Sequence, residues 1–103
     1  MSTPAYIGRE LYLQSLVNCT RAKYEQLIHV ADNDTIRSIV EILLNVYKGD
    51  IHLDQSELDL FAQYRSVIKT IVANKTHYKE KKVLLKSHPL IVQKAVKVLL
   101  RAI

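Results

Sequence analysis

The clearest helical pattern in the chain is DNDTIRSIVEILLNVYKG, residues 32–49. Its apolar residues recur at intervals of three and four, the spacing of one buried face of an α-helix. They are Ile36, Ile39, Val40, Leu43, Leu44 and Tyr47. The acidic and amide residues at 32–34 can form a turn or cap the helix, and Gly49 stands where a left-handed C-terminal stop is needed. This helix is therefore expected to lie in the core.

The rest of the chain has the same helical spacing, and no strand pattern competes with it. Further helices are predicted over residues 9–18, 20–31, 54–74, 76–86 and 89–103, with Thr20, Asp54 with Glu57, Thr76 and Pro89 at their starts. Their expected inward residues are Leu13, Leu16, Val17, Tyr24, Leu27, Ile28, Leu58, Phe61, Tyr64, Ile68, Ile71 and Val72. The sequence thus predicts an all-α fold, a compact bundle of five or six short helices. We expect a flexible N-terminus over residues 1–8 and a single helical domain over residues 9–103.

The composition suits a small domain that folds without disulfides or metal. The chain has 103 residues, of which 49% are apolar, and Cys19 is the only cysteine. A single thiol cannot form an intramolecular disulfide, so a reducing compartment is the simpler expectation. Neither a secretory signal nor a membrane-spanning run is evident in the sequence.

Charge is divided unevenly along the chain. Residues 65–103 carry ten basic residues and one acid, Glu80, for a formal charge of +9, whereas residues 1–64 carry five basic and nine acidic residues, for −4. A basic face attracts polyanions, because lysine and arginine replace the counterions of a nucleic acid or lie against anionic lipid headgroups. The alternative is a solvated, lysine-rich surface without a ligand.

Three lysines of the predicted fifth helix share one face. Lys79, Lys82 and Lys86 are three and four residues apart, so their mutual repulsion is unfavourable without an anion. Tyr78 beside them is either a base-stacking ring or a partly buried core residue. Lysine is a point charge rather than a bidentate reader of guanine, so contacts without sequence preference are expected. The candidate nucleic-acid-binding residues are Lys75, Lys79, Lys81, Lys82, Lys86, Lys94, Lys97 and Arg101.

The sequence gives little reason to expect an enzyme. Its four histidines are scattered, no pair of carboxylates has catalytic spacing, and its two glycines stand alone rather than in a phosphate-binding loop. Cys19 has no histidine neighbour close in sequence. We therefore expect no catalytic residue, no metal site and no cofactor.

Several short motifs resemble those of a known family. They are Leu44-Asn45-Val46-Tyr47-Lys48-Gly49-Asp50-Ile51-His52-Leu53, then Tyr64-Arg65, Ala73-Asn74-Lys75-Thr76, and the basic run from Lys79 to Lys86 with Lys81-Lys82-Val83-Leu84-Leu85. Over residues 11–88 the chain resembles the short basic proteins encoded beside capsid genes in Maverick/Polinton elements and adintoviruses. These proteins are often compared with the adenovirus core protein X.

The resemblance implies a particle-associated protein of the virion and host nucleus that contacts packaged double-stranded DNA, with a capsid protein as a further partner. The matching basic positions are Lys75, Lys79, Lys81, Lys82 and Lys86. The chain departs from the family pattern in two places. Glu57, Asp59 and Leu60 stand where the family is rich in lysine and arginine, and His88-Pro89-Leu90 with a helical ending replaces a glycine-glycine-phenylalanine tail. The first departure reduces the basic surface, and the second suggests a C-terminus adapted to docking.

Two further classes of function stay open. The chain is alternatively a protein-interaction module that forms homo-oligomers, because an acidic N-terminal half and a basic C-terminal half can associate head to tail. A third interpretation is contact with a membrane surface through residues 89–103, whose bases and aliphatic residues suit an interfacial helix.

Overall fold

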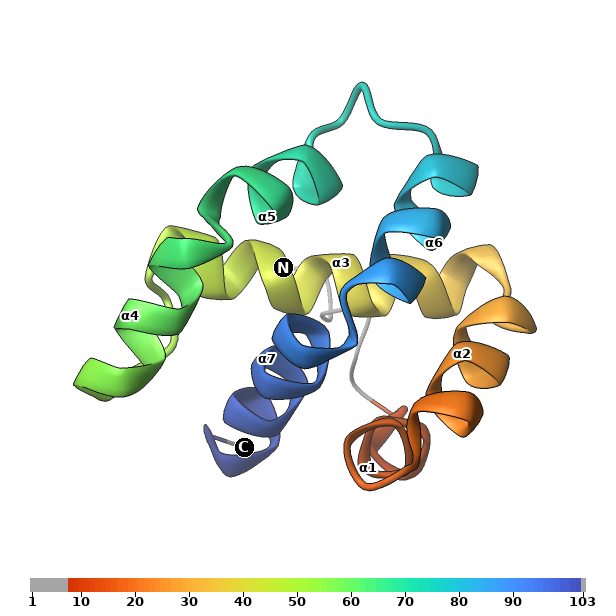
Figure 1. Ribbon diagram of the computed structural model, residues 1–103, viewed down its shortest axis with the longest axis horizontal. Helices are drawn as coiled ribbons and strands as arrows, with labels where there is room; N and C mark the ends of the chain where they lie inside the picture. The colour runs from red at the N-terminus through yellow and green to blue at the C-terminus, as the bar shows by residue number, and fades with distance from the viewer. Residues whose placement is uncertain (1–7, 103) are drawn as a thin grey trace.

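Seven α-helices lie in residues 8–102, the part of the chain that the computed structural model describes (Figure 1). They are α1 (Glu10–Val17), α2 (Arg21–His29), α3 (Asn33–Lys48), α4 (Gln55–Gln63), α5 (Arg65–Val72), α6 (Tyr78–Ser87) and α7 (Pro89–Ala102). The described residues contain no strand, so the predicted all-α class is confirmed, while five or six helices was too low a number. The predicted flexible N-terminus falls on residues 1–8, and of these only Gly8 is described.

Helix α3 crosses the middle of the molecule and is contacted by α5, α6 and α7 (Figure 1). Its predicted ends are confirmed. Asp32 Oδ1 accepts a hydrogen bond from Thr35 N at 2.8 Å, and Gly49 ends the helix with a φ of 80°. The left-handed conformation at that position favours glycine, because it has no Cβ.

The buried face of α3 is rotated from the predicted one. Its buried apolar residues are Ile36, Ile39, Ile42, Leu43 and Val46, whereas Val40, Leu44 and Tyr47 are only half-buried. The reason is tertiary, since α5, α6 and α7 all contact α3 and their packing decides which part of the apolar stripe is covered. Val40 and Leu44 are left to line a groove on the neighbouring side of the helix.

The prediction of one continuous helix over residues 54–74 is wrong, because the chain breaks at Tyr64 into two helices, α4 and α5. Tyr64 has φ −103° and ψ 14°, outside the helical region, and its ring lies edge-on to that of His88. The break changes the chain's direction, as Figure 1 shows, so that Phe61 of α4 and Ile68 of α5 both reach the core. Leu58, predicted to face inward, is 48% exposed. No glycine or proline marks the break in the sequence.

The predicted cap of α6 is displaced by one residue. Thr76 does not cap this helix, because its hydroxyl donates to the backbone oxygen of Thr70 at 2.7 Å. His77 caps it instead, since its Nδ1 accepts a hydrogen bond from Lys79 N at 3.2 Å. The other predicted starts are confirmed, with Thr20 capping α2 and Pro89 at the first position of α7.

The C-terminal helix supplies a large share of the core. Its buried residues are Ile91, Val92, Ala95, Val96, Val98 and Leu99, each no more than 2% exposed. They pack mainly against α1 and α3. Burying a Val or Leu side chain stabilises a fold by about 1.5–3 kcal/mol, so α7 is a main source of stability. The membrane contact predicted for residues 89–103 would require this face to leave the core.

Glu57 is a charged residue inside the fold, 1% exposed. Its side chain and that of Asp54 form the predicted capping box at the start of α4, with Glu57 Oε1 accepting from Asp54 N at 3.0 Å. Arg101 of α7 also donates two hydrogen bonds to the carboxylate, at 3.0 and 2.9 Å. The guanidinium and the Asp54 N–H lower the pKa of Glu57 below its ordinary value. The capping residue thus also ties α4 to α7.

Replacing Arg101 with alanine is expected to lower the free energy of unfolding by about 2 kcal/mol, because the buried carboxylate loses two charge-assisted hydrogen bonds and keeps only Lys94, at 3.9 Å, as a charged partner. Urea denaturation measures the change. Lys97→Ala, at an exposed position of the same helix, is the control and should change stability by less than about 0.5 kcal/mol. Equal effects of the two substitutions would show that the ion pair contributes nothing.

Stability should also fall in acid through Glu57. Because its folded-state pKa is lowered, its contribution is complete above the unfolded value of 4.5 and is lost as the pH falls through that value toward the folded pKa. Thermal unfolding across this range should show a steeper loss in the wild type than in Glu57→Gln. The carboxyl groups of Asp32 and Asp54, whose pKa values are also lowered, remain in both proteins. Parallel curves would contradict the assignment.

Candidate nucleic-acid interface

Three lysines of α6, Lys79, Lys82 and Lys86, form what we call the lysine ridge. Lys82 Nζ donates to the backbone oxygen of His29 at 2.9 Å, and Lys86 Nζ lies 3.4 Å from His29 Nδ1. Both ammonium groups therefore lie at the C-terminal end of α2, where carbonyls lack helical partners and the helix dipole favours positive charge. An ammonium carries three N–H donors, so Lys82 retains donors for an anion.

Lys81 has a structural position rather than a surface one. It is 6% exposed, and its ammonium donates to the backbone oxygens of Ile71 and Ala73, the latter at 2.9 Å. It thereby satisfies carbonyls at the end of α5 that have no helical partner. Burial lowers the pKa of Lys81. The sequence placed it among the nucleic-acid contacts, but its charge faces the inside of the fold.

Of the three predicted bases of α7, two lie near the carboxylate of Glu57 and one is exposed without it. Arg101 is bonded to Glu57, and Lys94 Nζ lies 3.9 Å from the same carboxylate. Lys97 is exposed and lies beside a shallow hollow that is also lined by Val17. The positive charge of α7 is therefore partly neutralised within the molecule.

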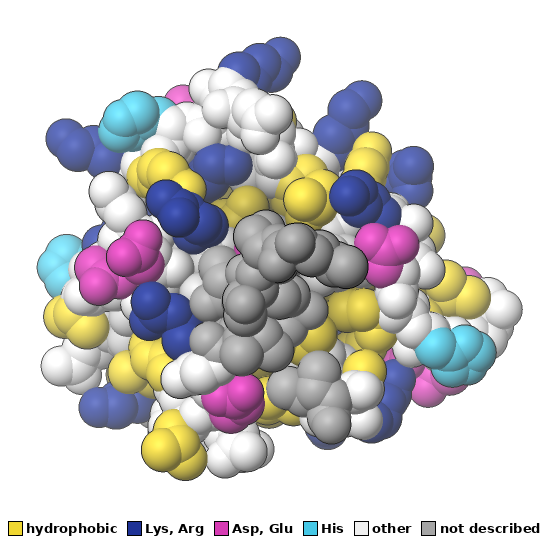
Figure 2. Space-filling view, turned by 180° about the vertical axis from the view of Figure 1, so that it is seen from behind, with side chains coloured by type: hydrophobic (Ala, Val, Ile, Leu, Met, Phe, Trp, Pro, Cys, Tyr) yellow, Lys and Arg dark blue, Asp and Glu magenta, His cyan; other side chains and the backbone are white. Residues whose placement is uncertain are grey.

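Besides the buried Lys81, five of the eight predicted residues form no ion pair with a carboxylate in residues 8–102, the part of the chain that the structure describes. They are Lys75, Lys79, Lys82, Lys86 and Lys97. Figure 2 shows Lys and Arg side chains mostly toward the upper part of one face, where the connection between α5 and α6 lies. Hydrophobic and acidic side chains lie between and below them. The basic surface is thus smaller than the charge count suggests, but it is present.

A second basic feature was not predicted. A groove of about 600 Å³, which we call the cationic groove, runs between α3 and the connection from α5 to α6. Arg37 and Lys48 of α3 line it, together with Lys75 and His77 of the connection. The two α3 residues are eleven positions apart, which places them on one side of the helix. That spacing is visible in the sequence, but both residues belong to its net acidic half.

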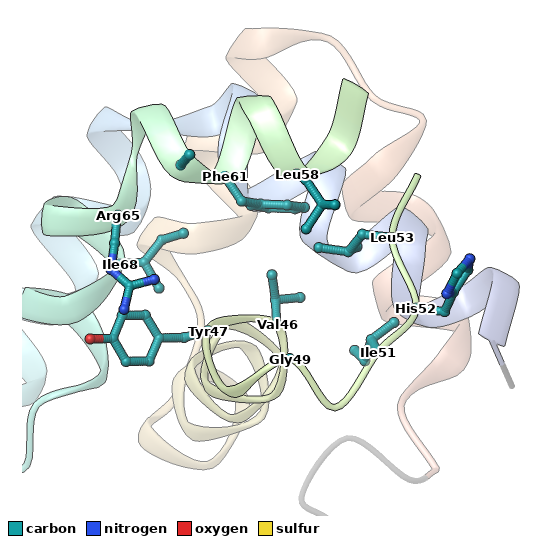
Figure 3. Close-up of a pocket in the computed structure, with 11 residues that line it drawn as sticks. Val46, Tyr47, Gly49, Ile51, His52, Leu53, Leu58, Phe61, Arg65 and Ile68 are labelled. Atoms are coloured by element: carbon teal, nitrogen blue, oxygen red, sulfur yellow. The ribbon is translucent and has the colours of Figure 1, made fainter. Parts of the chain in front are cut away.

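An apolar groove of about 570 Å³ lies between the end of α3 and helix α4 (Figure 3). Phe61 and Leu58 of α4 point across it toward Val46, as Figure 3 shows. At one end, the Arg65 guanidinium lies 4.9 Å above the ring centre of Tyr47, a cation–π contact. This groove is suited to apolar groups rather than to phosphate.

The described residues contain no group of three or more His, Cys, Asp or Glu that could hold a metal ion. Within residues 8–102, no helix has both the length and the apolar character needed to cross a bilayer. Comparisons of the chain with protein-family models, with curated proteins and with solved structures gave no match. The functional assignment therefore depends on the chain's own residues.

Because Lys81 is buried, its replacement is expected to destabilise the fold rather than to weaken contacts at the surface. Lys81→Gln should lower the free energy of unfolding by about 2 kcal/mol, because hydrogen bonds from a charged group to two carbonyls are lost or weakened. Lys79→Gln, two residues away and exposed, should change it by less than about 0.5 kcal/mol. Chemical denaturation measures the free energy of unfolding of both variants. An unchanged stability of Lys81→Gln would contradict the structural role of Lys81.

Proposed function

We propose that the chain is a non-enzymatic protein that binds nucleic acid without sequence preference, and that it compacts or packages DNA in a viral or mobile-element particle. The observation that carries this proposal is the group of five lysines that are not buried and that no described carboxylate neutralises, in a segment with one acid among ten bases. The resemblance to the basic proteins of Maverick/Polinton elements and adintoviruses supports the same function, and double-stranded DNA is its expected ligand.

The lysine ridge is the proposed centre of the interface. Its residues lie on successive turns of one helix, so the ammonium groups can contact a phosphate backbone at several points. Lysine contributes charge without the planar geometry that distinguishes bases, which favours binding to any sequence. Release of counterions supplies most of the free energy of such binding, which therefore weakens steeply as salt rises.

The apolar groove favours a second candidate, a protein-interaction module. Its lining includes Leu58, which is 48% exposed, and the adjacent acids Asp50, Asp54 and Asp59 are all exposed. An apolar surface with acidic neighbours is complementary to a basic partner, including the lysine ridge of a second copy. On this proposal the chain forms homo-oligomers or binds a capsid protein.

Binding of a random-sequence DNA duplex across a salt series tests the first proposal. The wild type should bind with micromolar affinity at low salt, and three phosphate contacts would give a slope of about −2.7 in log K against log salt. The triple substitution Lys79→Glu, Lys82→Glu and Lys86→Glu should abolish this binding, because it replaces three positive charges with negative ones.

A second triple variant controls for net charge. Lys23→Glu, Arg65→Glu and Lys69→Glu change the formal charge by the same amount at exposed positions of two other helices, α2 and α5. This variant should retain most of the affinity. Equal loss in both triples would show diffuse attraction rather than an interface at the ridge. No binding by the folded wild type would reject the DNA proposal, and concentration-dependent association measured by sedimentation would then favour the interaction module.

A further inference from the structure

The cationic groove has basic residues along both sides. Arg37 and Lys48 lie eleven residues apart on α3, a separation of about 16 Å along the helix axis, and Lys75 lies on the opposite side. Lys81 also lines the groove, with its ammonium bound to carbonyls. Glu41 is the one carboxylate among the lining residues. Positive charge therefore predominates in the groove, as an anionic ligand requires.

The floor of the groove is apolar. Val40, Leu44 and Val72 line it and are half-buried, so each keeps some apolar surface open to solvent. A ligand that fills the groove must therefore bring an apolar or planar group as well as negative charge. A double helix does not meet this requirement, because its bases are stacked inside and it presents mainly phosphate and sugar on its outside.

The groove also has polar groups suited to the edge of a base. Asn45 and Asn74 contribute side-chain amides, which both donate and accept hydrogen bonds. His77 uses Nδ1 to cap α6, which leaves Nε2 outside that contact. These groups come from α3 and from the connection between α5 and α6, so they face the groove from its two sides.

We infer that the cationic groove holds an unpaired stretch of nucleic acid, with a base against the apolar floor and flanking phosphates at Arg37, Lys48 and Lys75. This inference rests on the proposed function and specifies a single-stranded segment as a ligand. His77 lies between Lys75 and Lys79 in the chain, so the groove adjoins the lysine ridge. A strand leaving the groove can continue along the ridge, and the two sites together favour nucleic acid over an isolated small anion.

The test compares an oligothymidine strand with a random-sequence duplex by fluorescence anisotropy. The double substitution Arg37→Gln and Lys48→Gln should weaken strand binding about tenfold and reduce its salt slope by about 1.4, the value for two lost phosphate contacts. The matched control, Lys23→Gln with Lys69→Gln, removes the same charge from exposed positions that do not line the groove. Duplex binding should change equally in the two variants.

Two single substitutions keep the test decisive if the double variant is unstable. Arg37 Nε donates to the Tyr78 hydroxyl at 3.4 Å, and Arg37 lies 3.9 Å from Asp34, so its loss could disturb the fold. Lys48→Gln alone should weaken strand binding about threefold. Glu41→Gln should strengthen it, because it removes negative charge from the groove. Circular dichroism establishes that each variant is folded.

The outcomes separate the inference from the proposed function. If the wild type binds the duplex through the ridge, but groove and control variants bind the strand equally, the groove inference alone is rejected. If the wild type binds neither nucleic acid, both proposals fail together. Should the groove variants weaken binding of a polyglutamate peptide but not of the strand, the groove is a protein-binding site and the nucleic-acid inference is overturned.

Discussion

A buried carboxylate must be compensated, and in this protein the compensation of Glu57 determines how two distant segments are joined. An unpaired charge inside a protein is severely destabilising, so the burial of Glu57 depends on the bases that α7 brings to it, Arg101 at 2.9 Å and Lys94 at 3.9 Å. The bond links residues that are 44 positions apart. It also holds the first turn of α4, which carries Leu58 and so forms one wall of the apolar groove. The shape of the apolar groove therefore depends on the Glu57–Arg101 bond, although neither residue lines the groove.

The features that could be predicted from sequence are mostly local. The caps at Thr20, Asp32 and Asp54 depend on contacts within three residues, which a sequence displays directly. The break at Tyr64 and the burial of Lys81 depend instead on which residues pack nearby after folding. A lysine pattern on a helix looks the same whether one ammonium faces water or two backbone carbonyls.

The candidate site was predicted unevenly for the same reason. Helical spacing placed Lys79, Lys82 and Lys86 together correctly, because that relation lies within one helix. The cationic groove was missed, because it joins α3 to a connection that follows much later in the chain. Val40 and Leu44 fit the apolar pattern of a core helix, yet they line a surface groove once other helices cover the adjacent face of α3. Periodicity identifies an apolar stripe but not which part of it remains open.

The contacts of Lys82 and Lys86 with His29 connect the lysine ridge to the stability of α2. These ammonium groups already stabilise the C-terminal turn of α2, so an anion that draws them away competes with the helix for the same charges. Binding of such an anion and fraying of α2 would therefore be thermodynamically linked. Amide hydrogens near residue 29 would exchange faster when phosphate occupies the ridge, although the ligand need not touch α2. Hydrogen exchange at the C-terminal end of α2 would thus indicate whether the lysine ridge is occupied.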